Sequence, residues 1–459
     1  MDENGSYFSD LLVELPEELG MPEGFPEDWK IVRLGQLVDD HKLWIQNGFA
    51  QGSYNQTGYG IPHLRPFNIS DDGNLDFSQI KYVPEPANNS PYWLKSGDLI
   101  FNNTNSEELV GKTAYFFSDR KCVLSNHMTI IRVLDKEYID AYWLAKQLHY
   151  LWYLGFFKAI CRRHVNQASI SLARLREVTI LFPPFPEQRA IACVLLAVQQ
   201  AKEATEQVIQ ATRGLKKSLL CHLFTYGPVP VEEAEKVPLK ETEIGLVPEH
   251  WEMVRLGDIA LIRGGISFPP EFQGVTKGEY PFFKVSDMNL PGNEKVMFAA
   301  NNYITEQIKK TLGANPFPAG TVIFPKVGGA LHTNKKRILQ RLSLIDNNLM
   351  GITIIENRCS SDFLFHWFET VNLSDFCNPG PLPSINAMRI KNQGFPLPPL
   401  PEQREIARIL ETVDKKLQAE EARKQALETL FKTLLHHLMT GKVRVKPSEN
   451  VEEIEGIIE

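Results

Sequence analysis

The sequence predicts an α+β protein with two similar mixed α/β domains separated by two long antiparallel coiled-coil helices, as a pseudo-twofold internal repeat. Three observations lead to this fold class. A seven-residue motif occurs twice, a proline-free helical pattern follows each copy, and the segments before the two copies match at several points. The period is far too long for a solenoid, so it indicates a duplicated domain.

The motif Pro-Pro-x-Pro-Glu-Gln-Arg occupies residues 183–189 and returns 215 positions later at residues 398–404. Each domain opens with Pro-Glu-x-Trp followed by alternating apolar residues, a pattern typical of a strand that enters a core. Glycine-led apolar runs at residues 97–101 and 320–324 predict matching buried strands. Only short loop insertions separate the two copies.

These matches divide the chain into seven parts. We expect an N-terminal arm (1–25), a first domain (26–182), a first spacer helix (183–227), a linker (228–247), a second domain (248–397), a second spacer helix (398–441) and a C-terminal tail (442–459). Aromatic stretches near residues 138–157 and 363–371 predict one core-packed helix in each domain.

The apolar residues of the second spacer helix alternate at spacings of four and three, which is typical of a coiled-coil seam. The first helix has a weaker seam, with Lys202 at the position where the second helix has Leu417. Helices with so little apolar surface need a partner. Because both lie in one chain, we favour an intramolecular antiparallel pair over a coiled coil between two chains.

Composition indicates an ordinary soluble protein, with 43% hydrophobic and 23% charged residues. Six scattered cysteines without a Cys-x-x-Cys pair argue against a zinc cluster or a disulfide framework, and favour a reducing cytoplasm. The net charge of −7 argues mildly against a nucleic-acid partner, but acidic and basic clusters are segregated along the chain.

Catalytic motifs are missing from the sequence. The Gly-Lys-Thr at residues 111–113 lacks the earlier glycine of a phosphate-binding loop, and Ser106 occupies that place. Zinc-protease, serine-hydrolase and glycine-rich cofactor motifs do not occur. We therefore expect no catalytic residue, no metal and no cofactor in this chain.

The paired domains, each closed by a Pro-Pro-x-Pro-Glu-Gln-Arg helix ending in Thr-Gly or Thr-Tyr-Gly, resemble the specificity subunit of type I restriction-modification systems. The resemblance extends over roughly residues 20–443. It implies two target recognition domains, each reading one half of a bipartite, asymmetric sequence in double-stranded DNA. It also implies that the helices set the spacer between half-sites and dock two methyltransferase subunits, which two restriction/translocase subunits can join. S-adenosylmethionine, ATP and magnesium would belong to these partners.

Base edges in DNA are read by Arg, Lys, Asn and Gln side chains, so polar residues in the predicted loops are candidate DNA contacts. These candidates are Arg65, Asn102, Asn103, Asn105, Arg162, Arg163, Asn166 and Gln167 in the first domain, and Lys284, Lys326, Lys335, Lys336, Arg337 and Asn386 in the second. Candidate docking residues on the helices are Glu187, Gln188, Arg189, Leu195, Glu402, Gln403, Arg404 and Leu410.

Two other classes of function compete with DNA recognition. A structural coiled-coil adaptor would bind no DNA, and its binding would lack the steep salt dependence of phosphate contacts. A DNA-modifying enzyme would change bases without partners, although the missing motifs argue against it. For any single candidate residue, a solvated loop side chain is the plain structural alternative.

Overall fold

The computed structural model describes residues 25–51, 53–88, 90–378 and 382–446. It divides into two compact units. Unit 1 consists of two segments, the residues up to Thr205 and those from Arg423 onward, and unit 2 spans Glu206–Ala422. Each unit contains one α/β domain with parts of both long helices. The acidic N-terminal arm and the acidic end of the tail lie outside the described residues.

In unit 1, an antiparallel pair of strands joins the two ends of the domain: β1 (Lys30–Arg33) pairs with β12 (Thr179–Phe182). The central sheet has the order β2-β9-β5-β7 and is entirely antiparallel. Its strands are β2 (Leu43–Asn47), β9 (Met128–Val133), β5 (Asp98–Asn102) and β7 (Thr113–Phe116). The alternation of apolar residues in these strands buries one face against the domain helices.

Two smaller sheets complete the first domain, β4 (Lys81–Val83) with β3 (Ile61–Leu64) and β8 (Val123–Leu124), and β10 (Arg162–Arg163) with β11 (Ala168–Ser169) and β6 (Thr104–Asn105). The helices are α2 (Leu34–Asp39), η2 (Pro66–Asn68), α3 (Ala141–Tyr153), α4 (Phe156–Ile160) and α5 (Leu172–Glu177). Asp140 caps helix α3, because its side chain accepts a hydrogen bond from the backbone amide of Trp143.

Unit 2 repeats this plan. The pair β15 (Glu252–Arg255) and β24 (Gly394–Leu397) joins the domain ends, and the main sheet has the order β16-β23-β20-β21-β18. Its strands are β16 (Ala260–Gly264), β23 (Leu349–Ile354), β20 (Val322–Pro325), β21 (Arg337–Leu339) and β18 (Val296–Met297). A second sheet contains β19 (Tyr303–Ile304), β17 (Tyr280–Phe283) and β22 (Leu344–Ile345).

The helices of the second domain are α7 (Leu256–Ile259), η4 (Pro270–Phe272), η5 (Val285–Asn289), α8 (Glu306–Thr311), η6 (Gly329–Thr333), α9 (Ser361–Thr370), η7 (Leu373–Phe376) and α10 (Ala387–Lys391). The segment predicted as a linker contains η3 (Val231–Lys236) and a hairpin of β13 (Leu239–Thr242) and β14 (Gly245–Pro248).

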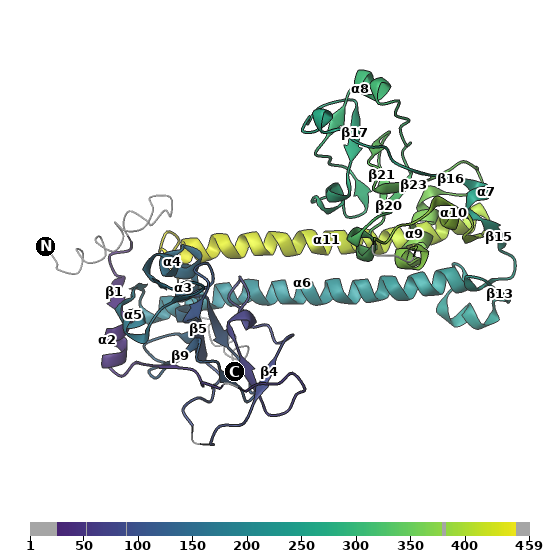
Figure 1. Ribbon diagram of the computed structural model, residues 1–459. Coiled ribbons are helices and arrows are strands. Elements are labelled where there is room, and N and C mark those ends of the chain that lie inside the picture. The colour runs from purple at the N-terminus through teal and green to yellow at the C-terminus, as the bar shows by residue number, and fades with distance from the viewer. Residues whose placement is uncertain (1–24, 52, 89, 379–381, 447–459) are drawn as a thin grey trace. The chain divides into compact units, whose positions relative to one another are not determined.

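The two long helices are α6 (Phe185–Tyr226) and α11 (Leu400–Met439). In unit 1, Ile191 and Leu195 of α6 share a buried core with Phe431 and Leu435 of α11. In unit 2, Ile406 and Leu410 of α11 share one with Leu223 of α6. The first turns of one helix therefore pack against the last turns of the other in each unit (Figure 1), which confirms the antiparallel pair.

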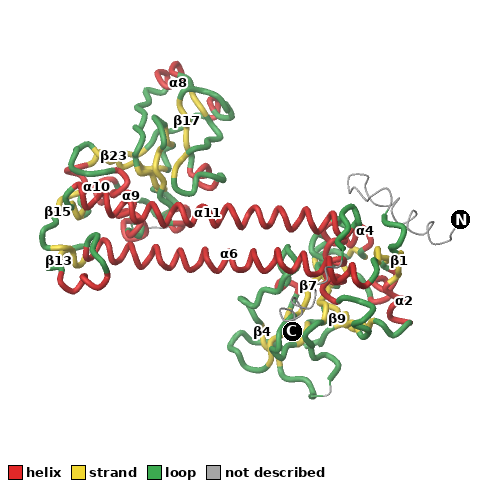
Figure 2. Tube along the Cα trace, turned by 180° about the vertical axis from the view of Figure 1, so that it is seen from behind, coloured by secondary structure: helices red, strands yellow, loops and turns green. Residues whose placement is uncertain are grey.

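The domain strands lie beside the helix pair in both units and not between the two helices (Figure 2). Trp143 and Trp367 are buried in the domain cores, as predicted for the aromatic stretches that became α3 and α9. The fold class predicted from the repeat is thus confirmed, and it leaves one face of each domain to contact the helices and other faces exposed.

Candidate nucleic-acid interface

A small sheet with an exposed hairpin gathers five of the eight candidates in the first domain. Strand β10 pairs with β11, which pairs with β6, so Arg162 and Arg163 lie in the same small sheet as Asn105. The turn between β10 and β11 holds Asn166 and Gln167, whose side chains are exposed. We call residues 162–169 the reading hairpin.

The side chains of the reading hairpin have few internal commitments. The Arg163 guanidinium lies 3.1 Å from the Glu107 carboxylate, but both groups are substantially exposed. Val165 at the tip is 99% exposed. Such a two-stranded ribbon with arginine and amide side chains has the size and chemistry to enter a DNA major groove.

A second exposed group in this domain surrounds Tyr54, a residue that the sequence interpretation missed. The Arg65 guanidinium lies 4.4 Å and the Lys81 ammonium 4.0 Å from the centroid of its ring. Tyr59 is 83% exposed nearby in the chain. Aromatic rings and arginine side chains are groups on which unpaired bases stack, and no sequence motif marks this cluster.

Two candidates in the first domain must be corrected. Asn102 is fully buried and donates a hydrogen bond to the Leu109 carbonyl at 2.8 Å. Asn103 is nearly buried and donates to the Thr129 hydroxyl at 3.0 Å. Their hydrogen bonds hold the end of β5 inside the domain. Because both side chains are buried and already bonded, neither is available to a base.

The candidates in the second domain are more dispersed. Lys284 occupies the place in the second domain that Arg65 occupies in the first. Each residue precedes a short helix and donates its backbone amide to the side chain of the third residue of that helix. Lys284 also donates to the Gln273 side chain at 3.0 Å. The exposed Asn386 caps α10 by accepting a hydrogen bond from the Met388 amide at 2.9 Å. This cap already occupies its side-chain oxygen.

Lys326 lies at the edge that corresponds to the reading hairpin. Ile385 donates its amide to the Lys326 carbonyl, just as Ile170 donates to the Asn103 carbonyl in the first domain. Val327 forms a bridge with Ser384 at this edge. Residues 379–381 of the same segment lie outside the described residues. Lys326 is therefore the candidate best placed to match the hairpin of the first domain.

Residues 335–337 form a basic run whose members point in different directions. Lys336 is buried, and its ammonium donates to the Asn334 side chain at 2.9 Å and to the Val371 carbonyl. Burial lowers the pKa of Lys336 to about 8. The prediction for Lys336 is corrected, because it is a structural lysine. Lys335 contacts Asn289, and the half-buried Arg337 donates to the Met288 carbonyl at 3.2 Å.

The repeated motif contacts the opening motif of its own domain. In unit 1, the Trp29 indole donates to Glu187 at 2.9 Å, and in unit 2 the Trp251 indole donates to Glu402 at 2.9 Å. Gln188 accepts a hydrogen bond from the amide of Asp140, the residue that caps α3. These contacts explain why the two motifs recur together.

The same glutamine contact recurs in unit 2. Gln403 accepts a hydrogen bond from the Ser360 amide at 2.9 Å and donates to the Pro398 and Arg358 carbonyls. Gln403 and Leu410 are fully buried in unit 2, as Gln188 and Leu195 are in unit 1. Surface docking by these four side chains would require them to be exposed, so their contacts indicate a different role, which is to attach each helix to its domain.

Of the other docking candidates, Glu187 is also buried, Arg189 and Glu402 are partly exposed and Arg404 is exposed. Arg404 lines a groove of about 1030 Å³ between the second domain and the helices of unit 2, together with Lys295, Glu411 and Asp414. The docking of partner subunits stays a prediction for the exposed helix surface.

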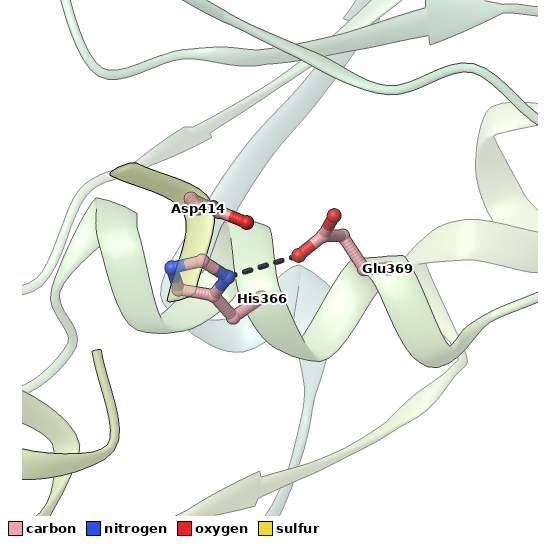
Figure 3. Close-up of side chains that lie close together, drawn as sticks. All are labelled: His366, Glu369 and Asp414. Carbon is pink, nitrogen blue, oxygen red and sulfur yellow. Dashed lines mark hydrogen bonds and ion pairs between the residues drawn. The ribbon is translucent and has the colours of Figure 1, made fainter. Parts of the chain in front are cut away.

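His366, Glu369 and Asp414 converge beside this groove (Figure 3). The His366 ring lies 2.9 Å from Glu369. The Lys216 ammonium lies 2.7 Å from Glu369 and 2.6 Å from Asp414, and thus supplies the positive charge between the two carboxylates. The trio is part of an ion-pair network, which accounts for its composition without a metal ion.

Comparisons with known proteins agree with this architecture. The family model "Type I restriction modification DNA specificity domain" matches twice, at residues 26–212 and 248–429. The type I restriction enzyme MjaX specificity subunit of Methanocaldococcus jannaschii is 28% identical over 431 residues, covering 92% of this chain and 95% of that protein. The EcoDI specificity subunit of Escherichia coli is 24% identical and covers 61% and 66% of the two chains.

Among solved structures, the specificity subunit from M. genitalium superimposes with a TM-score of 0.57 at 13% identity, covering 93% of this chain and 98% of that one. A chain from a type I restriction-modification assembly gives a TM-score of 0.52 at 17% identity, covering 92% and 100%. Within the described residues, the long helices are too polar to cross a bilayer, and no other helix is long enough. The chain therefore belongs to the family of type I restriction-modification specificity subunits, the non-catalytic DNA-recognition components of these systems.

Proposed function

We propose that each of the two domains reads one half-site of a bipartite, asymmetric DNA sequence, and that α6 and α11 set the unread spacer and dock two methyltransferase subunits. The observation that carries the proposal is the exposed reading hairpin, with two arginines, an asparagine and a glutamine in and beside one turn. Arginine reads guanine and asparagine or glutamine reads adenine through paired hydrogen bonds.

The second domain supports an asymmetric target because its corresponding edge differs in sequence. Lys326 stands where the first domain has Asn103, and Ser384 pairs with Val327 there. Different side chains at the same edge would read different bases. In this proposal methyl transfer, with S-adenosylmethionine, belongs to the partner subunits, and two restriction/translocase subunits with ATP and magnesium can join them in the cytoplasm.

The decisive experiment maps methylated adenines in DNA that has been exposed to the complex of this chain with its methyltransferase partners. We expect a bipartite consensus with a fixed spacer. Arg162→Ala with Gln167→Ala should relax only the half-site read by the first domain, with a discrimination loss of about 1–3 kcal/mol for each lost base contact. The other half-site and the spacer should not change.

Arg174→Ala is the matched control, because Arg174 is an exposed arginine of the same domain that pairs with Glu177 on its own helix. This variant should methylate the wild-type sequence. If the hairpin variant kept the wild-type consensus, or if both half-sites relaxed together, the assignment of the hairpin to one half-site would be wrong.

A further inference from the structure

Each domain makes a second contact with the helices, several turns away from the repeated motif. In unit 1, the Asp72 carboxylate pairs with Lys202 of α6, and Lys146 of α3 lies 5.4 Å from the ring centroid of Phe431 of α11. We call these four residues the first seat. All of them belong to unit 1.

Lys146 is the central residue of the first seat. It is 1% exposed, and its ammonium donates to the carbonyls of Asp72 and Gly73 at 3.4 and 3.3 Å. Burial lowers the pKa of Lys146 to about 8, with the nearby Asp72 carboxylate opposing that effect. The nearby Lys202 ammonium adds to the effect of burial, so a further cation, or the loss of the Asp72 carboxylate, would raise the cost of burying Lys146.

The second seat, in unit 2, consists of Lys295, Glu369, Lys216 and Asp414. Lys295 follows η5, as Asp72 follows η2, and its ammonium pairs with Asp414 at 2.8 Å and with Glu411 of α11. Glu369 of α9 pairs with Lys216 of α6 at 2.7 Å. Figure 3 shows Glu369 and Asp414 at this contact.

The repeat relates the two seats position by position. On the helices, Lys202 corresponds to Leu417, Gln199 to Asp414 and Phe431 to Lys216, at the shift of 215 that relates the two motifs. On the domain helices, Lys146 corresponds to His366 and His149 to Glu369, because Asp140 and Ser360 occupy the same capping position.

The charges of the two seats are inverted. The domain loop is acidic and its helix partner basic in the first seat, whereas the loop is basic and its helix partners acidic in the second. In unit 1 the lysine is Lys146 on the domain helix, and it faces Phe431 of the spacer helix. In unit 2 the lysine is Lys216 on the spacer helix, and it faces Glu369 of the domain helix.

Exchanging the seats would therefore fail at both contacts. The first domain on the second seat would place Asp72 opposite acidic side chains and buried Lys146 opposite Lys216. The second domain on the first seat would leave Lys295 without its carboxylates and Glu369 against Phe431. Like charges in contact, or a charge held at the interface without its partner, oppose both exchanges.

We propose that the inverted ion pairs make each recognition domain specific for its own seat on the helix pair, and so reject a second copy of either domain at the wrong seat. Asp72, Lys146, Lys202 and Phe431 position the first domain. Lys295, Glu369, Lys216 and Asp414 position the second. The motif attaches each domain to a helix, and the seat selects which domain is accepted.

The test uses a full-length chain in which residues 26–182 are replaced by a second copy of residues 248–397. We expect the transplanted domain to exchange its core amide hydrogens at least tenfold faster than the native second domain. Converting the first seat with Leu196→Glu, Gln199→Asp, Lys202→Leu and Phe431→Lys should restore most of that protection. Equal exchange with and without the conversion would overturn the proposal.

Charge reversal in the unmodified chain keeps the proposal testable if the transplant does not fold. Asp72→Lys should speed amide exchange in unit 1 at least tenfold, because it faces Lys202 and Lys146, and adding Lys202→Asp should recover much of the loss. If the two substitutions lowered amide protection additively in the double variant, Asp72 and Lys202 would not act as a matched pair. Neither readout involves DNA, so a failed seat and a failed proposal for DNA reading can be told apart.

Discussion

The junctions and the seats join the same domains to the same helices, yet they have diverged differently. The two junctions are the contacts of Trp29 with Glu187 and of Trp251 with Glu402, together with the bonds of Gln188 and Gln403. Both junctions use one tryptophan, one glutamate and one glutamine in the same bonds. The seats share no pair of side chains. A contact that only needs to attach a helix can stay the same in both copies, whereas a contact that distinguishes the copies has to differ.

The largest expected effect tests the shared junction. Gln188→Ala and Gln403→Ala should each destabilise their own unit by about 3 kcal/mol, because each leaves buried backbone groups without a partner. Amide hydrogen exchange measured on peptides from each unit gives the two losses separately. The exposed Gln210→Ala and Gln418→Ala should cost less than about 0.5 kcal/mol. Clearly unequal losses at the two junctions would contradict their equivalence.

Acid should lower the stability of the two units over different pH ranges, because unit 1 has His149 where unit 2 has Glu369. Burial lowers the pKa of His149 from 6.5 to about 3. Between these values the unfolded chain binds a proton that the folded chain does not. The contribution of neutral His149 to the free energy of unfolding of unit 1 is therefore fully present above pH 6.5. It falls as the pH is lowered, by about 2 kcal/mol at pH 5.

Glu369 behaves differently. Burial opposes its ionisation, but hydrogen bonds from His366 and Lys216 lower its pKa below 4.5 overall. Its contribution is thus present above pH 4.5 and is lost only below it. Amide exchange at pH 7 and pH 5, corrected for the intrinsic rate, should show acid loosening at α3 that His149→Gln reduces. The remainder in unit 1 should come from His63, because burial lowers the pKa of His63 to about 4. Equal loosening in His149→Gln would assign the acid sensitivity to other groups.

The smallest effect concerns Arg444, which is present at only one junction. Its guanidinium contacts Glu187 at 2.6 Å and Asp28 at 2.7 Å, whereas Glu402 in unit 2 receives one bond from His250 at 2.9 Å besides its bond from Trp251. Arg444→Met should cost unit 1 about 1 kcal/mol, since Arg444 and Asp28 are substantially exposed and the buried Glu187 keeps its bond from Trp29. His250→Ala should cost less, and a larger loss from His250→Ala would reverse this comparison.

The duplicated domains, the two helices and the positions of the junctions can be predicted from the sequence alone. These are encoded locally, because proline, glutamate and the apolar spacing start and sustain a helix wherever it lies. The recurrence of Trp29 with Glu187, and of Trp251 with Glu402, was also visible as two motifs that repeat together. Strands at Leu99 and Val322 followed from short apolar runs after glycine.

Which polar side chains are exposed depends on packing in three dimensions. Asn102, Asn103 and Lys336 looked like loop candidates, but packing from distant segments buries them. The seats could not be predicted either, because Asp72 and Lys202 are far apart in sequence and carry no motif. Burial and ion pairing are decided by which segments meet, and that depends on the packing of the whole unit.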